Sequence, residues 1–454
     1  MSPAPPQGSS RKLAILCLAH WSESGRPIQE FIDNYIHASA LPTADRQLAV
    51  MLVLGVLRRQ QYLDIILAKF SKTPLRKMKP LTLAALRVGI FQLCFLSRIP
   101  DSAAVNETVK ALKKCRQPGW LIKYVNGTLR AVARARENLP GPDTAAPGGR
   151  PVPEHPDWLV RRWQKHFGIA GTAEICGINT SDPKLCIQVN TSRIATQELT
   201  DMLRRAGTEA TPGKYAPNSL VLPDFRGAVH RLPGFPEGLF LVQDQAAFLA
   251  TMLCSPRGKN SRLLDGCAGL GGKTCTLAWT LPEGASVTAV EPDRRRTRLL
   301  LENLGRLKLQ DRVTPVRQTL QAFAATNPDR FDGILIDAPC SGTGVIRRHP
   351  DIRWNRCPED LPGFQATQIE LLETAASLVK PGGFLVYATC SLEPEENREV
   401  IDHFLDTHPR FSLSDSREFL PPAASSLVDA NGFFSPLPSD EIEGFFAARM
   451  VKNP

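Results

Sequence analysis

The sequence has no run of uncharged apolar residues long enough to cross a membrane. A membrane-spanning helix needs about 18 such residues, and even the apolar stretch Leu48–Leu57 includes a glycine and runs into Arg58. The apolar run Leu13–Ala19 is too short for a secretory signal, and no small-residue cleavage site follows it. These absences argue against a membrane or exported protein, and we expect a cytoplasmic one.

The cysteine patterns of disulfide frameworks and zinc sites are also missing. Eleven cysteines are an odd number, whereas a secreted disulfide framework uses an even one, and structural disulfides are rare in the cytosol. No CxxC motif or nearby histidine pair accompanies Cys340 or Cys390, as a zinc site would require. We therefore expect no metal site.

What the sequence contains is typical of a soluble protein with several domains. It has 454 residues, of which 43% are apolar and 22% charged. The formal net charge of +10 is compatible with a polyanionic partner such as nucleic acid, although many basic proteins bind none.

The chain divides into four parts. Residues 1–139 have apolar residues at spacings of three and four and no strand-like alternation, which predicts a helical bundle. Proline and glycine crowd residues 140–156 and predict a linker. Residues 157–236 combine helical and strand-like segments, which predicts a small α+β unit. Residues 237–454 predict an α/β domain that opens with a strand at Leu239–Gln243 and ends with strands near Gly432–Phe434 and Gly444–Met450.

Two cysteines follow two predicted strands of this last part. An apolar strand ends at Asp337, and Pro339 cannot continue it because proline lacks an N–H donor. The segment Gly383–Ala388 leads to Cys390 in the same way. Ligands of open α/β sheets bind at the carboxyl ends of the strands, so we predict a site that contains Asp337, Cys340 and Cys390.

The glycine-rich loop Gly266–Thr274 predicts a cofactor site. Cys267 stands where a Walker phosphate loop needs glycine, and Thr274 stands where a dinucleotide fingerprint needs one. The remaining interpretation is the loop with which Rossmann-like methyltransferases bind S-adenosylmethionine. Glu291 ends the next predicted strand, where an acidic side chain suits a ribose diol.

Taken together, these motifs resemble the RNA cytosine-C5 methyltransferases of the Fmu/Sun (RsmB-like) family. The segments that carry the resemblance are Asp337–Cys340, Gly344–Asp351, Thr389–Ser391 and Pro394–Asn397. The resemblance implies that Cys390 is the nucleophile, that Cys340 is associated with product release, and that Asp337 hydrogen-bonds the base.

The same resemblance implies which residues hold the cofactor. They are Cys267, Ala268, Gly269, Leu270, Gly271, Gly272, Lys273, Glu291, Gln318 and Asp337. The family usually has Ala-Pro where Gly269 and Leu270 stand, and an aspartate that accepts from the adenine amino group where Gln318 stands. Three roles remain open for Lys273: it lowers the pKa of the nucleophilic thiol, it orients the base, or it is only a structural residue at a helix start.

The implied activity is methylation of cytosine C5 in small-subunit (16S) ribosomal RNA, through a covalent bond between cysteine and C6. The helical front part resembles a NusB-like RNA-binding domain, which favours ribosomal RNA over transfer RNA, the nearest alternative. A non-catalytic RNA-binding ribosome-assembly factor is the alternative from another class. We expect a monomer with no membrane partner.

Three groups of polar residues are further candidates for RNA contact. Near Cys340 we expect Arg347, Arg348, His349 and Arg353 to hold phosphates that flank an extruded cytidine. Asn190 and Arg193 loosely match an RNA-holding pattern of the family, with ordinary turn chemistry as the other interpretation. Phosphate contact and a solvated helix face both remain open for Lys113, Lys114, Arg116, Lys123, Arg130, Arg134 and Arg136.

Overall fold

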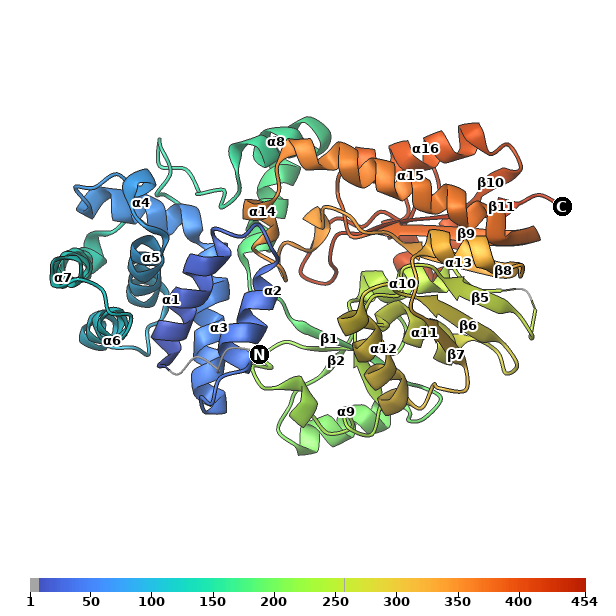
Figure 1. Ribbon diagram of the computed structural model, residues 1–454, viewed down its shortest axis with the longest axis horizontal. Coiled ribbons are helices and arrows are strands. Elements are labelled where there is room, and N and C mark those ends of the chain that lie inside the picture. The colour runs from blue at the N-terminus through green and yellow to red at the C-terminus, as the bar shows by residue number, and fades with distance from the viewer. Residues whose placement is uncertain (1–7, 257) are drawn as a thin grey trace. The chain divides into compact units, whose positions relative to one another are not determined.

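The computed structural model describes residues 8–256 and 258–454, which form two compact units (Figure 1). The first unit runs to Ser181 and also includes Ile346–Arg356, and the second comprises Asp182–Val345 and Cys357–Pro454. The chain therefore leaves the second unit soon after Cys340, contributes one segment to the first unit, and returns. Across the described ranges, no helix combines the length and apolarity needed to cross a bilayer.

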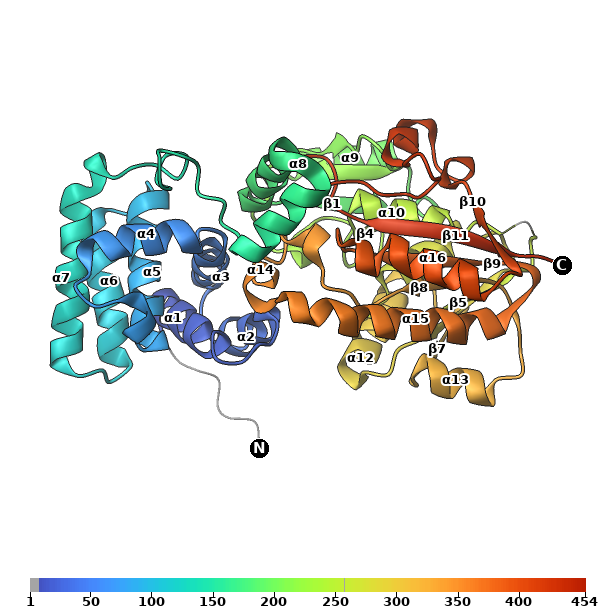
Figure 2. The ribbon, with the colours of Figure 1, turned by 90° about the horizontal axis from the view of Figure 1, so that it is seen from above.

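The first unit is an all-helical bundle (Figures 1 and 2). Its helices are α1 (Ser10–Trp21), α2 (Ile28–Phe31), α3 (Thr43–Arg58), α4 (Gln60–Phe70), α5 (Pro80–Phe95), α6 (Asp101–Lys114), α7 (Gly119–Ala135), α8 (Asp157–Thr180) and α14 (Ile352–Asn355). Helix α5 packs against α1, α3, α4, α6 and α7. Its close approach to α3 depends on Gly55, because a Cβ there would lie 2.1 Å from the ring of Phe91.

The proline-rich segment between α7 and α8 is irregular but ordered. The Tyr62 hydroxyl donates to the carbonyl of Pro140 at 3.0 Å, and Val152 packs against the bundle core. Glu154 and His155 are fully buried. Although we expected this segment to be a linker before the α+β unit, it and α8 both belong to the first compact unit.

The second unit contains a small antiparallel sheet with strand order β2-β3-β1-β4. Its elements are β1 (Leu185–Val189), α9 (Thr196–Arg205), β2 (Thr211–Pro212), β3 (Ser219–Leu222) and β4 (Phe240–Val242). We expected Leu239–Gln243 to open the catalytic domain, but β4 pairs with β1. Alternation in a sequence reveals a strand and not its partner, so the pairing of this strand with the small sheet could not be read from the sequence.

The large sheet has the order β10-β11-β9-β8-β5-β6-β7. Strands β5 to β9 are parallel, and β10 and β11 are antiparallel. The strands are β5 (Arg262–Asp265), β6 (Ser286–Val290), β7 (Val313–Val316), β8 (Phe331–Asp337), β9 (Val379–Thr389), β10 (Phe411–Ser414) and β11 (Phe446–Lys452). The predicted strand at Gly432–Phe434 is only an isolated bridge, in which Phe434 pairs with Val428 and Ala447.

Helices cover both faces of this sheet (Figure 2). Two hydrophobic clusters fill the space between the helices and the sheet. The covering helices are α10 (Gln245–Met252), α11 (Gly272–Thr280), α12 (Arg294–Leu307), α13 (Leu320–Thr326), α15 (Leu361–Leu378) and α16 (Arg398–Thr407). Strand order reverses between β5 and β8, which makes a topological switch point where such sheets bind ligands. The predicted fold class is confirmed: a helical bundle, a small α+β part and a Rossmann-like domain.

Candidate active site

The two predicted cysteines lie together beside the ends of β8 and β9. The strands stay paired to their last residues, since Asp337 lies opposite Ala388. The sulfur atoms of Cys340 and Cys390 are 3.4 Å apart, and both are free thiols. A disulfide bond would be about 2.05 Å long, so this is a hydrogen-bonding distance. Hydrogen bonding to Cys390, together with burial, raises the pKa of Cys340 well above its usual value. Cys340 therefore keeps its proton at neutral pH.

One buried carboxylate ties the two cysteine loops together. Glu396 is fully buried and accepts hydrogen bonds from Ser341 N–H at 2.7 Å and from the Ser341 hydroxyl. It also accepts from the Ser391 hydroxyl at 2.5 Å and from Gln368 Nε2 at 3.1 Å. Ser341 and Ser391 each follow a cysteine directly. Because four donors compensate for the burial of the charge, Glu396 can fix the spacing of the two thiols.

Hydrogen bonds of Asn397 and Gly344 also hold the two cysteine loops in place. The side chain of Asn397 accepts from the Thr389 hydroxyl at 2.6 Å and donates to the carbonyl of Ser391 at 2.9 Å. Gly344 N–H donates to the carbonyl of Cys390 at 2.9 Å. A Cβ on Gly344 would lie 2.4 Å from the carbonyl oxygen of Gly444, so this approach requires glycine. Sequence reasoning gave Glu396 and Asn397 no role, although the run Pro-Glu-Glu-Asn was the available signal.

Lys273 points at Asp337 from the start of α11. Its Nζ lies 2.6 Å from Asp337 Oδ2 and 5.0 Å from the centre of the Phe445 ring. Burial, the largest single influence, lowers the pKa of Lys273. The charge of Asp337, its hydrogen bond to Lys273 and the smaller effects of Cys390 and Asp265 together outweigh burial, so that the net pKa is above its usual value. Lys273 is therefore an ammonium ion paired with a carboxylate. The Asp337 side chain remains 31% exposed, which leaves it accessible to a substrate.

Asp265 holds the loop before α11 through hydrogen bonds. This carboxylate is buried, accepts from the Thr274 hydroxyl at 2.7 Å and accepts more weakly from Cys267 N–H at 3.3 Å. Burial raises the pKa of Asp265 to about 6. Gly271 caps the helix with a φ of +86°, and a Cβ there would lie 2.3 Å from Leu300 Cδ1. Only glycine meets both demands.

The loop and Glu291 suit a nucleoside with a ribose diol. One Glu291 oxygen accepts from Gly269 N–H at 2.9 Å and the other from Asp293 N–H at 2.8 Å. A carboxylate has about four acceptor sites, so each oxygen can accept one more hydrogen bond. A Cβ on Gly269 would meet nothing within 4 Å, so this residue, which departs from the usual Ala-Pro pair, leaves open space. Leu270 is 52% exposed, and Gln318 is exposed just after β7.

Two of the four predicted phosphate-binding residues near Cys340 do not fit that role. Arg353 is fully buried in the first unit, where its two terminal nitrogens donate to the carbonyls of Glu154 and Asn179 at 2.8 Å each. Arg347 is only 4% exposed. A guanidinium already surrounded by protein cannot reach an RNA phosphate, so this expectation was wrong for these two arginines.

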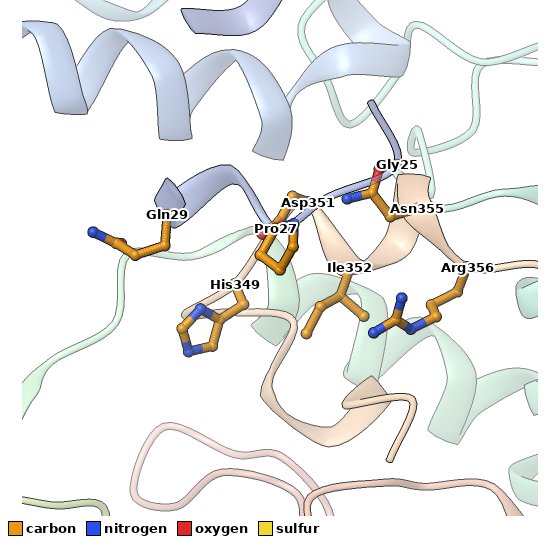
Figure 3. Close-up of a pocket in the computed structure, with 8 residues that line it drawn as sticks. All are labelled: Gly25, Pro27, Gln29, His349, Asp351, Ile352, Asn355 and Arg356. Atoms are coloured by element: carbon orange, nitrogen blue, oxygen red, sulfur yellow. The ribbon is translucent and has the colours of Figure 1, made fainter. Parts of the chain in front are cut away.

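Two other members of that group remain partly accessible. Arg348 is half-buried. His349 is exposed and lines a cavity of about 140 Å³ within the first unit, together with residues such as Gln29, Asp351 and Arg356 (Figure 3).

Asn190 and Arg193 hold a turn in the small sheet. Asn190 is fully buried, and its backbone N–H donates to the carbonyl of Leu239 at 2.9 Å. Arg193 donates to the carbonyl of Glu237. These contacts agree with the turn interpretation of Asn190 and Arg193, and RNA contact by either residue stays a prediction.

Comparison with known proteins gives matches along the whole chain. Family models match in the order NusB family (residues 8–134), RsmF/B-like ferredoxin-like domain (155–230) and 16S rRNA methyltransferase RsmB/F (251–451). A Bacillus subtilis protein named "Probable ribosomal RNA small subunit methyltransferase B" is 32% identical over 449 residues, which cover 98% of this chain and 99% of that protein.

Two further matches agree. Ribosomal RNA small subunit methyltransferase B of Salmonella arizonae is 33% identical over 451 residues, or 98% of this chain and 99% of that protein. The crystal structure of a methyltransferase homolog protein from Pyrococcus horikoshii is 27% identical with a TM-score of 0.56, and the match covers 66% of this chain and 95% of that one. Near-complete coverage above 30% identity, with three domain matches and a cofactor loop, leads to one conclusion: the chain belongs to the RsmB/F family of S-adenosylmethionine-dependent RNA methyltransferases.

Proposed function

We propose that this protein methylates C5 of cytosine in small-subunit ribosomal RNA through a covalent bond between Cys390 and C6. The observation that carries the proposal is the pair of sulfur atoms 3.4 Å apart beside the carboxyl ends of β8 and β9. Cytosine C5 is too weak a nucleophile to take a methyl group directly, and addition of a thiolate to C6 overcomes this. The names of the relatives support ribosomal RNA as substrate, and hence a cytoplasmic location.

The covalent step uses Cys390 and the Lys273–Asp337 pair. Cys390 gives its proton to solvent water and reacts as a thiolate: its sulfur bonds to C6, and the electron pair of the C5–C6 double bond moves toward C5. Asp337 accepts a hydrogen bond from the 4-amino group, and the adjacent ammonium of Lys273 stabilises the negative charge that builds on the ring. S-Adenosylmethionine, when bound, supplies the methyl group. The C5 proton then leaves to a base, the C6–S bond breaks, and the ring double bond and the Cys390 thiolate re-form.

Cys340 acts in the last of these steps. Because its raised pKa keeps it protonated, its thiol can donate a hydrogen bond to the departing sulfur of Cys390 and stabilise the thiolate. Glu396 positions both cysteines through Ser341 and Ser391. Loss of Cys340 should therefore slow release more than attack, and the protein–RNA adduct should accumulate.

The test is a denaturing gel of the full chain after incubation with S-adenosylmethionine and small-subunit ribosomal RNA that lacks the modification. Cys340→Ala should give a slowly migrating protein–RNA band, and both Cys390→Ala and the double variant should give none. Cys357→Ala is the matched control, because Cys357 is the exposed cysteine among those described. Nuclease digestion and mass spectrometry should identify 5-methylcytosine in RNA treated with wild type.

The other outcomes are equally informative. A band with Cys390→Ala instead would exchange the two roles. Methyl incorporation into transfer RNA but not ribosomal RNA would replace the substrate. If wild type forms no 5-methylcytosine in either RNA and calorimetry detects no binding of S-adenosylmethionine, the catalytic proposal fails in favour of a binding factor.

A further inference from the structure

An exposed tryptophan stands at the tip of the α6–α7 hairpin. Trp120 lies in the first turn of α7 and is 70% exposed. It is the one aromatic among the large apolar side chains that the described part of the chain exposes. Tryptophan normally covers most of its large apolar surface, so an exposed indole suggests that a partner covers it.

The chain around Trp120 is strongly cationic. Between Thr108 and Arg136 the sequence has eight lysines and arginines and no aspartate or glutamate. Two of the eight form ion pairs, Lys110 with Glu107 and Arg136 with Asp101, at 2.7 Å each. The other six are exposed, and no ion pair joins them to any other described residue: Lys113, Lys114, Arg116, Lys123, Arg130 and Arg134.

Arg116 occupies a position that favours glycine. It lies just past the end of α6 with a φ of +54°, in the left-handed region. Gln117 N–H returns to the carbonyl of Leu112, which satisfies one of the last carbonyls of α6. Glycine adopts this conformation without the steric strain that a Cβ introduces. An arginine here adopts a backbone conformation that costs a side chain some strain, and it places one more cation at the tip.

We propose that this tip binds an unpaired stretch of the RNA substrate. Trp120 stacks on one exposed base, while Lys113, Lys114, Arg116 and Lys123 contact the neighbouring phosphates. Six exposed positive charges that form no ion pair with other described residues match a polyanion, and a protruding indole requires a base that is free of its own helix. The inference rests on the proposed function in taking RNA as the substrate. An acidic protein partner would use the cations but would not depend on stacking.

Equilibrium binding of a short unstructured RNA to the full chain tests this, with the same sequence as a duplex for comparison. Trp120→Leu keeps an apolar side chain but removes the aromatic face, and should weaken single-strand binding roughly tenfold. Trp120→Phe should retain most of the affinity, and duplex binding should change little. Ile169→Ala is the control, because Ile169 is 78% exposed on α8 and should bind as wild type does.

Arg116→Gly separates binding from folding. It should raise the unfolding temperature, because it relieves the backbone strain, and at the same time weaken RNA binding. One lost phosphate contact should reduce the slope of log affinity against log salt by about 0.7 for a single strand. A variant that is more stable and binds less tightly cannot be explained by damage to the fold.

Two results would overturn the inference. One is unchanged single-strand affinity in Trp120→Leu, and the other is an equal loss of single-strand and duplex binding, which would assign the tip to phosphates alone. The binding assay contains no S-adenosylmethionine, so its result is independent of catalysis. Failure here with normal 5-methylcytosine formation would leave the proposed function intact, and the reverse pattern would leave the RNA-binding tip intact.

Discussion

Two groups of cations in the first unit look alike in sequence and differ completely in structure. Arg347 and Arg353, which follow the proposed catalytic residue Cys340 in the sequence, are at most 4% exposed. Lys113, Lys114 and Arg116, on a hairpin without any motif, are exposed and form no ion pair with other described residues. A position near a motif is therefore a poor predictor of RNA contact. A better one is whether the N–H groups of the cation already donate to acceptors within the protein.

Arg353 has acceptors because helices end around it. The last carbonyls of a helix and its first N–H groups have no partner within the helix. Arg353 donates to the carbonyl of Asn179 at the end of α8, and Trp354 Nε1 donates to that of Leu57 at the end of α3, both at 2.8 Å. The Asp351 carboxylate accepts from Ile28 N–H at the start of α2 at 3.0 Å. The segment that follows the Cys340 loop thus completes three helices of the bundle.

The largest expected effect tests whether Arg353 is structural. Arg353→Met keeps much of the volume but leaves two buried carbonyls without donors, so it should lower the free energy of unfolding by about 3 kcal/mol or more. Denaturant unfolding measures this. Lys113→Met is the matched control and should change stability by no more than about 0.5 kcal/mol. If Arg353→Met instead keeps wild-type stability and reduces the salt dependence of RNA binding, the two groups of cations are not different after all.

A medium effect concerns Glu154, whose backbone carbonyl accepts from Arg353. Its side chain is fully buried and accepts from Gln61 N–H at 3.0 Å. Burial raises the pKa of Glu154 to about 7. Between pH of about 4.5 and 7 the unfolded chain has released this proton and the folded chain retains it. The contribution of Glu154 to stability is therefore complete below that window and is lost as the pH rises through it.

The measurement is the free energy of unfolding at several pH values within the window. The contribution of Glu154 should fall by up to about 1.4 kcal/mol for each pH unit. Glu154→Gln cannot ionise and should remove that part of the slope. Lys114→Ala, on the exposed hairpin, is the control variant and should leave the slope unchanged. An unchanged slope in Glu154→Gln would show that this carboxyl is not held protonated by its burial.

The sequence predicts where the strands end, but it does not predict which side chains hydrogen-bond to one another. Asp337, Cys340 and Cys390 were found because Pro339 and the apolar runs mark where strands end. Sequence reasoning did not find Glu396, because a carboxylate with four donors is a property of the folded loops. It also misjudged Arg353, because the helix ends that supply its acceptors are far away in the sequence.

The smallest expected effect concerns His349, the exposed member of the group near Cys340. His349 lines the cavity of about 140 Å³ with Gln29 and Arg356 (Figure 3), and an uncharged imidazole at neutral pH adds little attraction for phosphate. His349→Ala should change the free energy of unfolding by no more than about 0.5 kcal/mol and RNA affinity by less than about twofold. Direct binding to unmodified small-subunit ribosomal RNA measures the RNA affinity.

A loss of RNA affinity as large as that expected for Trp120→Leu would mean that the cavity accepts part of the RNA. The segment that follows the Cys340 loop would then bind RNA as well as complete the bundle, and burial alone would no longer separate the two groups of cations.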